Sequence, residues 1–288
     1  MTTRPANTSA QPRIGITGST GQIGGMVARS LADRGIPLTL LARTPSRAPA
    51  LEGATAVACS YEDSEQSRAA LADIDVLFMV SASESEERLS QHLAFVAAAA
   101  AAGVSHIIYL SFQGASASST FTLARTHGAT EEAIRASGMT WTFLRDSFYL
   151  DFFAELAGED GVIRGPAGNG RCGAVARADV ARVAAAVIAN ASDYEGRTLD
   201  LTGPEALTME DVAATMSRVT GRRITYHDET IDEAYESRKK WPAPQWQYDA
   251  WVSTYTAIAR GELDLVTNDV EEVTGRAPLS FEDVLRAQ

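Results

Sequence analysis

Three glycines near the start of the chain have the spacing of a phosphate-binding loop. Gly18, Gly21 and Gly24 follow a short apolar run and precede a helical pattern. The first glycine permits a tight turn, the second lets the backbone approach a pyrophosphate, and the third lets helix and strand pack closely. The N–H groups and positive dipole end of the helix then attract the phosphates. The alternative is a tight turn without a ligand. The pattern predicts dinucleotide contacts from Gly18, Ser19, Thr20, Gly21, Gln22 and Ile23.

The end of the second predicted strand indicates which dinucleotide binds. In an NAD site, an acidic residue about 20 positions after the glycines binds the ribose 2′-hydroxyl. The corresponding segment here has no acidic residue, but it carries Arg43 and Arg47. A guanidinium group matches the geometry of a phosphate, so these residues favour NADP, with NADPH preferred over NADH. The alternative is that both are ordinary surface cations of an arginine-rich chain.

Further contacts to the cofactor are expected where the later strands end. Tyr61 follows the third predicted strand, where the adenine would lie, unless its segment is only a polar loop that caps a helix. Small residues follow the fourth strand and permit close approach of a ligand. In such sheets, ligands bind in the crevice outside the carboxyl ends of the strands. The expected contacts are Tyr61, Val80, Ser81, Ala82, Ser83, Ser111 and Phe112.

Alternating apolar and helical segments must position these residues. Several apolar segments have the length of strands, and most are followed by a helical pattern. The predicted strands span residues 13–17, 38–41, 55–59, 75–80, 105–110 and 139–144. The alternation predicts repeated β-α-β units, and right-handed crossovers favour a doubly wound parallel sheet of order 3-2-1-4-5-6. The expected fold class is therefore α/β, of Rossmann type.

The pattern changes after the sixth predicted strand. We expect residues 1–12 to be a disordered tail and residues 13–150 to be an NAD(P)-binding Rossmann domain. Residues 151–288 form a smaller, partly helical substrate-side region, interleaved with the sheet edge. Within it, a helix is expected at residues 209–220, with Thr208 as its N-cap.

Aromatic residues are concentrated around this second region. Residues 230–260 have a helical pattern that Pro242 and Pro244 interrupt. One interpretation of the aromatic residues is an apolar lid over a planar ligand, and the other is ordinary packing. The residues concerned are Phe148, Tyr149, Phe152, Phe153, Trp241, Trp246, Trp251 and Tyr255.

Composition excludes several classes of protein. The 288 residues carry a formal net charge of −12, which repels the phosphates of nucleic acids. Two cysteines are too few for a disulfide framework, and His92, His106 and His227 are scattered without metal-ligand spacing. The first residues do not resemble a signal peptide, and no apolar run is long enough to span a membrane. We therefore expect a cytoplasmic protein without a metal, and with no membrane or nucleic-acid partner; a homo-oligomer stays open.

Several motifs, in order along the chain, resemble one family. The glycine loop, Arg43 and a series of later segments are similar to NmrA-like atypical short-chain dehydrogenases/reductases, in particular the NAD(P)H:quinone oxidoreductase type. The later segments are residues 91–92, 101–104, 129–132, 137–138, 142–145, 168–171, 176–181 and 274–276. The resemblance covers almost the whole chain from Arg13. It implies a Rossmann fold with NAD(P) in the crevice.

The chain lacks the proton-transfer triad of typical members of the wider superfamily. Those proteins use a Ser, a Tyr and a Lys four residues after the Tyr, which lowers the pKa of the Tyr. The lysines of this chain are Lys239 and Lys240, well past the sixth predicted strand. We therefore interpret the spacing of Tyr235 and Lys239 as coincidence.

Three other residues are candidates for catalysis. His127 lies at the start of the helix after the fifth strand and could supply a proton or bind a ribose, unless it is only a polar residue of the first helical turn. Gln113 could orient a substrate oxygen. Tyr149 could donate to a carbonyl group or only pack over the ring. Asp146 stands where this family would have Pro or Asn, and it either faces the ligand or caps the next helix.

The leading prediction is an NAD(P)H-dependent oxidoreductase that acts on a quinone or a related aromatic carbonyl compound. A quinone accepts a hydride readily, so positioning its ring supplies most of the catalysis and the missing triad fits such substrates. One variant is aromatic polyketide tailoring in antibiotic biosynthesis, by reduction or by monooxygenase-type hydroxylation and quinone formation. The alternative is a non-catalytic NAD(P) redox sensor of the NmrA type that regulates a protein partner.

Overall fold

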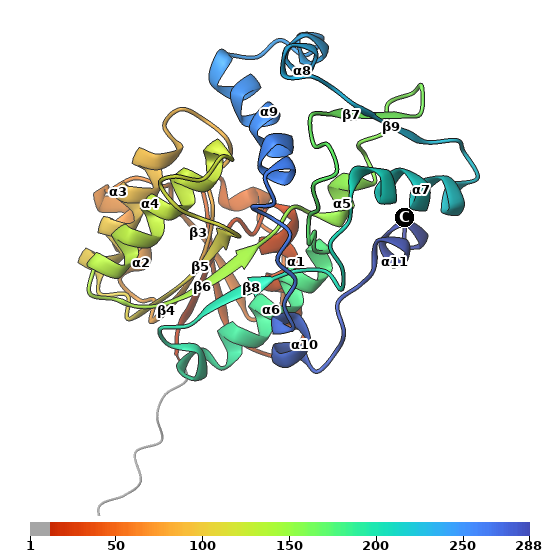
Figure 1. Ribbon diagram of the computed structural model, residues 1–288. Helices are drawn as coiled ribbons and strands as arrows, with labels where there is room; N and C mark the ends of the chain where they lie inside the picture. Colours follow the sequence, from red (N-terminus) through yellow and green to blue (C-terminus); the bar gives the residue numbers. More distant parts are fainter. Residues whose placement is uncertain (1–11) are drawn as a thin grey trace, which may run out of the picture.

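A seven-stranded parallel sheet forms the centre of the molecule (Figure 1). The structure is a computed structural model and describes residues 12–288. The strands lie in the order β3-β2-β1-β4-β5-β6-β8, so the predicted 3-2-1-4-5-6 order is confirmed and β8 adds a strand beyond β6. They are β1 (Ile14–Thr17), β2 (Leu38–Ala42), β3 (Ala54–Ala58), β4 (Val76–Val80), β5 (His106–Phe112), β6 (Thr140–Asp146) and β8 (Thr198–Leu201). The predicted disorder of residues 1–12 falls, except for Pro12, outside the described residues.

Helices cover both faces of this sheet and bury its apolar side chains. One face is covered by α1 (Gln22–Ala32), α6 (Arg177–Ala189) and α10 (Asp269–Thr274). The other is covered by α2 (Glu65–Leu71), α3 (Arg88–Ala102) and α4 (Thr122–Ala136). Because β4 and β5 lie inside this sandwich, they are apolar and buried almost throughout, as expected for a parallel sheet covered on both sides.

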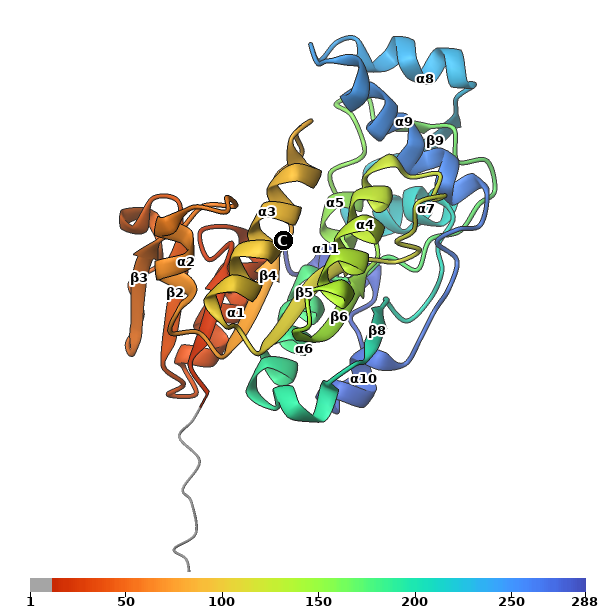
Figure 2. The same cartoon turned by 90° about the vertical axis from the view of Figure 1, so that its left-hand side faces the viewer.

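The C-terminal elements form a smaller part beyond the carboxyl ends of the strands. Figure 2 shows α8 and α9 on that side of the sheet. β7 and β9 pair in parallel as a separate ribbon. The backbone N–H of Thr122, at the start of α4, donates to Ser253 Oγ of α9 at 3.2 Å and joins the two parts. The elements are α5 (Leu150–Phe153), β7 (Val162–Gly165), α7 (Met209–Thr220), β9 (Thr225–Asp228), α8 (Ile231–Arg238), α9 (Gln245–Ala259) and α11 (Phe281–Arg286).

Local signals set the ends of these helices. Thr208 caps α7 as predicted, and Asp211 accepts a hydrogen bond from the Thr208 backbone in return, which completes a capping box. Pro242 and Pro244 lie between α8 and α9, because proline lacks the N–H that a helix interior needs. The loop after Tyr61 does cap a helix, since Ser64 accepts from the Ser67 N–H at the start of α2.

Candidate cofactor and active site

The turn between β1 and α1 has the geometry of a phosphate-binding loop. Gly18 has a φ of +64°, and a Cβ atom at Gly24 would lie 2.3 Å from the Gly18 carbonyl oxygen. Gly21 is the N-cap of α1, and no side chain of residues 12–288 caps the first amides of that helix. Ser19 Oγ is buried and has no hydrogen-bond partner within residues 12–288. These free donors at the positive end of a helix fit a pyrophosphate group.

Two arginines lie at the neighbouring strand end. Arg43 follows β2 directly, and Arg47 ends the short 3-10 helix Pro45–Arg47. Both side chains are exposed, and neither forms an ion pair within the described part of the chain. β2 is paired with β1 in parallel, so Arg43 lies on the same edge of the sheet as the glycine turn. This position suits a ribose 2′-phosphate.

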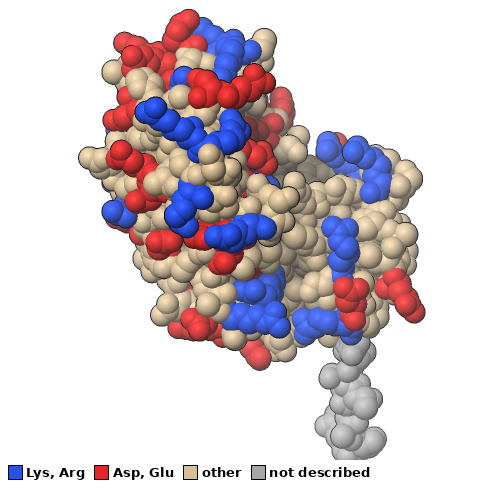
Figure 3. Space-filling view, turned by 90° about the vertical axis from the view of Figure 1, so that its right-hand side faces the viewer, with Lys and Arg blue, Asp and Glu red and all other residues tan. Residues whose placement is uncertain are grey.

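A first cavity, of about 240 Å³, opens where β4, β5 and β6 end. Figure 3 shows a hollow in the surface of the molecule, with Lys and Arg side chains along its edge. Phe112, Phe121 and Phe148 form an aromatic wall with ring centroids 5.0 to 5.2 Å apart. The predicted residues that line this cavity are Ser81, Ala82, Ser83, Ser111, Phe112, His127 and Tyr149.

Asp146 and Tyr149 form one polar pair in the lining of this cavity. Asp146 is the last residue of β6, and Tyr149 is the N-cap of α5. The Tyr149 hydroxyl donates a hydrogen bond to Asp146 Oδ2. Burial raises the pKa of Asp146 to about 8, against the lowering effects of this hydrogen bond and of the Arg88 charge. At neutral pH the carboxyl group therefore holds a proton beside the ligand space.

Arg88 and His127 form a second polar pair in the same cavity. Arg88 Nη2 donates to His127 Nε2 at 2.8 Å, so His127 carries its proton on Nδ1 and directs it to the Tyr109 hydroxyl at 2.9 Å. Burial, the Arg88 charge and the neighbouring His92 hold the pKa of His127 well below its ordinary value. His127 is therefore neutral at physiological pH, with both ring nitrogens engaged. Arg88 is 5% exposed and pairs with no carboxylate within residues 12–288.

The remaining predicted residues lie at the borders of the site. Gln113 is buried outside the first cavity, where Nε2 donates to the Leu265 carbonyl oxygen and Oε1 has no partner within residues 12–288. The hydroxyl of Tyr61 contacts Thr17 Oγ1 and the Val80 carbonyl oxygen, and its ring stacks on a buried phenylalanine at 4.3 Å. The Ser111 hydroxyl donates to a buried carboxylate on α4 at 2.6 Å. The predicted contacts and catalytic roles of all these residues stay predictions.

Comparisons with known proteins agree with this geometry. A family model described as NAD(P)H-binding matches residues 18–191. Quinone oxidoreductase 2 of Escherichia coli is 36% identical over 223 residues, which cover 75% of this chain and 77% of that protein. The crystal structure of the NADPH-dependent quinone oxidoreductase QOR2 of Escherichia coli, complexed with NADPH, superposes with a TM-score of 0.86. Its identity is 30%, over 95% of this chain and 99% of that chain.

This chain belongs to the NAD(P)H-binding family. The predicted membership among NmrA-like atypical short-chain dehydrogenases/reductases is confirmed, as is NAD(P)H as cofactor. The chain is an NAD(P)H-dependent oxidoreductase. A further relative, (4-alkanoyl-5-oxo-2,5-dihydrofuran-3-yl)methyl phosphate reductase of Streptomyces griseus, is 33% identical over 277 residues, which cover 93% of this chain and 95% of that protein.

Sequence reasoning misses one residue of the first cavity, Arg88, and recognises another, Asp146, only in part. Arg88 was missed, although its helix carries a buried stripe at helical spacing through His92, Phe95 and Ala99. That stripe indicates which face of α3 is buried. Arg88 lies on the same face at the start of the helix, and this position is the signal that could have identified it as a buried arginine. Asp146 was recognised as unusual, but its protonation depends on burial that the sequence does not display.

Other kinds of site are not found in the described part of the chain. Within residues 12–288, no group of three or more His, Cys, Asp or Glu side chains is arranged to hold a metal ion. None of the helices described there has both the length and the apolar character needed to cross a bilayer.

Proposed function

We propose that this oxidoreductase uses NADPH to reduce quinones or related aromatic carbonyl compounds in the first cavity. The observation that carries this proposal is the combination, in one small space, of an aromatic wall with the buried Asp146 and its hydrogen-bond partner Tyr149. In this proposal a flat ring packs against the wall, and Asp146 supplies the proton that the reduced oxygen needs. The quinone reductase among the relatives supports the same substrate class.

In the proposed reaction, one group of residues binds the cofactor and another orients the acceptor. The glycine turn and Arg43 hold the cofactor, which supplies a hydride when bound. Phe112, Phe121 and Phe148 orient the acceptor ring and exclude water from it. One hydride and one proton convert a quinone into a hydroquinone, so the enzyme needs a single acid.

Asp146 and Arg88 act on the quinone oxygen that gains negative charge when the hydride is transferred. The protonated carboxyl group of Asp146 donates to that oxygen, while the Tyr149 hydroxyl holds the carboxyl group in place. The buried guanidinium of Arg88 stabilises developing negative charge, since it has no carboxylate partner among the described residues. His127 acts through Arg88 as a positioning residue in this proposal, because its own proton points towards Tyr109.

The proposal is tested by following NADPH and NADH oxidation against benzo-, naphtho- and anthraquinones, with and without oxygen. Quinone-dependent turnover in both atmospheres supports the reductase. Oxygen incorporation into the product would instead support the hydroxylating variant of polyketide tailoring. Tight binding of NADPH without turnover on any acceptor would contradict the proposal and favour the redox sensor.

A further inference from the structure

Six of the eight aromatic residues that the sequence singled out line two cavities, whereas Phe153 is buried in the core and Trp246 lines neither cavity. Phe148 and Tyr149 line the first cavity. Phe152, Trp241, Trp251 and Tyr255 line a second one, of about 500 Å³, formed by α5, β7, α8 and α9. Among the residues that the structure describes, none lines both cavities. The volume of the second lies in the range of small-molecule sites, which is about 300–1,000 Å³.

The mouth of the second cavity presents large aromatic side chains to solvent. Trp241 is 55% exposed and Phe152 is 41% exposed. The rings of Trp241 and Trp251 lie edge to face with centroids 6.4 Å apart. Exposed aromatic groups that converge on one hollow are typical of a ligand site, because a flat ligand can cover them.

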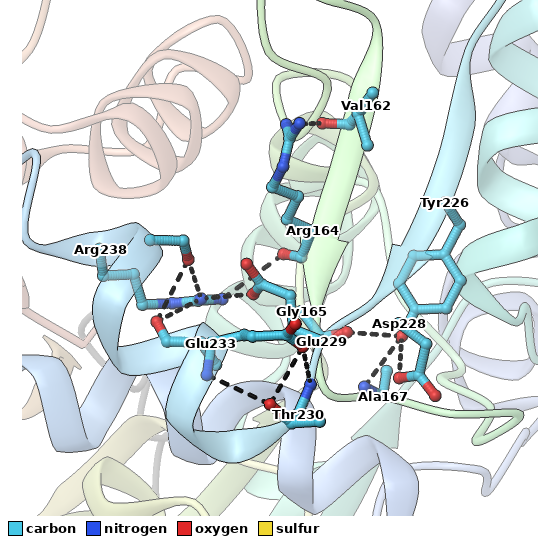
Figure 4. Close-up of polar contacts among 12 residues, drawn as sticks. Val162, Arg164, Gly165, Ala167, Tyr226, Asp228, Glu229, Thr230, Glu233 and Arg238 are labelled. Carbon is cyan, nitrogen blue, oxygen red and sulfur yellow. Dashed lines mark hydrogen bonds and ion pairs between the residues drawn. The ribbon is translucent and has the colours of Figure 1, made fainter.

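The floor of this cavity is closely packed and its charge is balanced. Figure 4 shows Arg238 directed towards Glu229, and the two form an ion pair at 2.9 Å. Both side chains are almost fully buried. The Arg238 guanidinium lies 5.1 Å above the Tyr255 ring, which packs so closely on Gly165 that a Cβ there would lie 2.2 Å from it. The floor is therefore preformed, and its arginine is already satisfied.

One cation at the rim has no carboxylate partner in residues 12–288. The Lys240 ammonium lies 4.0 Å from the centre of the Trp241 ring and forms no ion pair there. The other charged lining groups are Arg164, which pairs with Asp160, and Glu155 on the α5 side. Lys239, next in the chain, is paired with Glu236 and does not line the cavity. An acidic group on a ligand seated against Trp241 would pair with Lys240.

We propose that the second cavity is a separate ligand site, which binds a flat aromatic molecule carrying an acidic group such as a carboxylate. The ring system packs between Trp241, Trp251 and Phe152, and the acidic group meets Lys240. This inference goes beyond the proposed reductase activity and does not depend on it.

The test is calorimetric titration of the full chain with 2-naphthoate and with its neutral analogue 2-naphthamide, without NADPH or an acceptor. We expect 2-naphthoate to bind roughly two- to fivefold more tightly, the effect of one partly exposed ion pair. Lys240→Glu removes that preference, and the matched control Lys239→Glu keeps it. Trp241→Leu weakens both ligands roughly tenfold through lost ring contacts, whereas Trp246→Leu, on α9 but outside the lining, leaves them unchanged.

Several results would overturn the proposal. They are no binding of either naphthalene, equal affinity for the acid and the amide, or equal losses in the variants and their controls. Trp241 and Lys240 are both exposed, so their substitution should leave the fold intact, which thermal melting and the NADPH affinity of each variant verify. Because the titration contains neither cofactor nor acceptor, its failure is distinguishable from failure of the reductase proposal.

Discussion

The hydroxyl of Tyr149 donates a hydrogen bond to Asp146 Oδ2, and both side chains line the cavity where β4, β5 and β6 end. Burial raises the pKa of Asp146 to about 8, while the Tyr149 bond and the Arg88 charge lower it. His127 of α4 and Glu84 of the loop after β4 complete the titratable lining, and His127 stays neutral. If this pair serves the proposed reaction, the activity should depend on pH in the alkaline range.

Quinone reduction should fall as the pH rises through about 8, because Asp146 then loses its proton. Asp146→Asn has no titrating group, so its rate is lower but its profile lacks this decline. Tyr149→Phe removes a bond that lowers the pKa of Asp146, so its decline moves to higher pH. The measurement is kcat/KM against pH for the three proteins. An identical alkaline decline in Asp146→Asn would contradict the role of Asp146.

The free energy of unfolding should depend on pH through the same ionisation of Asp146. The pKa of Asp146 is raised from 3.8 to about 8 in the folded state, so the folded chain holds this proton more firmly than the unfolded chain. That contribution to stability is complete below the unfolded pKa and is lost as the pH rises through about 8. Thermal unfolding at several pH values should show the natural protein losing stability relative to Asp146→Asn over this range. Parallel curves would mean that the carboxyl group is ionised throughout.

Arg43→Glu should weaken NADPH binding far more than NADH binding. The charge-assisted hydrogen bonds to a 2′-phosphate are worth about 1.5–3 kcal/mol, or roughly 10- to 150-fold in affinity. NADH lacks that phosphate and loses little. Dissociation constants of both cofactors provide the measurement, with the exposed and distant Arg222→Glu as the control. Equal losses for the two cofactors would exclude Arg43 from the phosphate site.

Alanine at the second and third loop glycines should have different effects. At Gly24 a Cβ would lie 2.3 Å from the Gly18 carbonyl oxygen, so Gly24→Ala should lower both the melting temperature and NADPH affinity. At Gly21 the contact with that oxygen is 3.3 Å, which the turn can accommodate. Gly21→Ala should therefore keep most of the stability and lose cofactor affinity, because the methyl group blocks the pyrophosphate. A Gly21→Ala protein with unchanged NADPH affinity would contradict this assignment.

His127→Ala should lower turnover while NADPH affinity is mostly kept. The change leaves a buried donor of Arg88 without its acceptor, which costs about 1–3 kcal/mol of stability. The pKa of His127 lies well below its ordinary value, so the pH profile near neutrality should keep its shape. Steady-state kinetics over pH and chemical denaturation check both effects. Unchanged kinetics would remove His127 from the reaction, and loss of a titration near neutrality would make it a proton donor in its own right.

The sequence by itself determined the order of the first six strands and the glycine turn between β1 and α1. Both depend on local properties: runs of apolar residues, glycines at fixed spacing, and arginines in place of an acid after β2. Thr208 as the cap of α7 and the proline break between α8 and α9 are local in the same sense. Such features can be predicted without knowing the distant contacts, because the backbone conformation of a few neighbouring residues specifies them.

Only the tertiary structure decided the charge states and the grouping of the side chains. His127 has the sequence properties of a residue that titrates near neutrality, yet burial against Arg88 keeps it neutral. Asp146 becomes an acid with a proton at neutral pH because β6 and α5 enclose it with Tyr149. Six of the eight aromatic residues separate into two cavities for the same reason, because residues far apart in the chain meet only in the fold. Burial and long-range packing set these properties, and neither can be read from spacing along a chain.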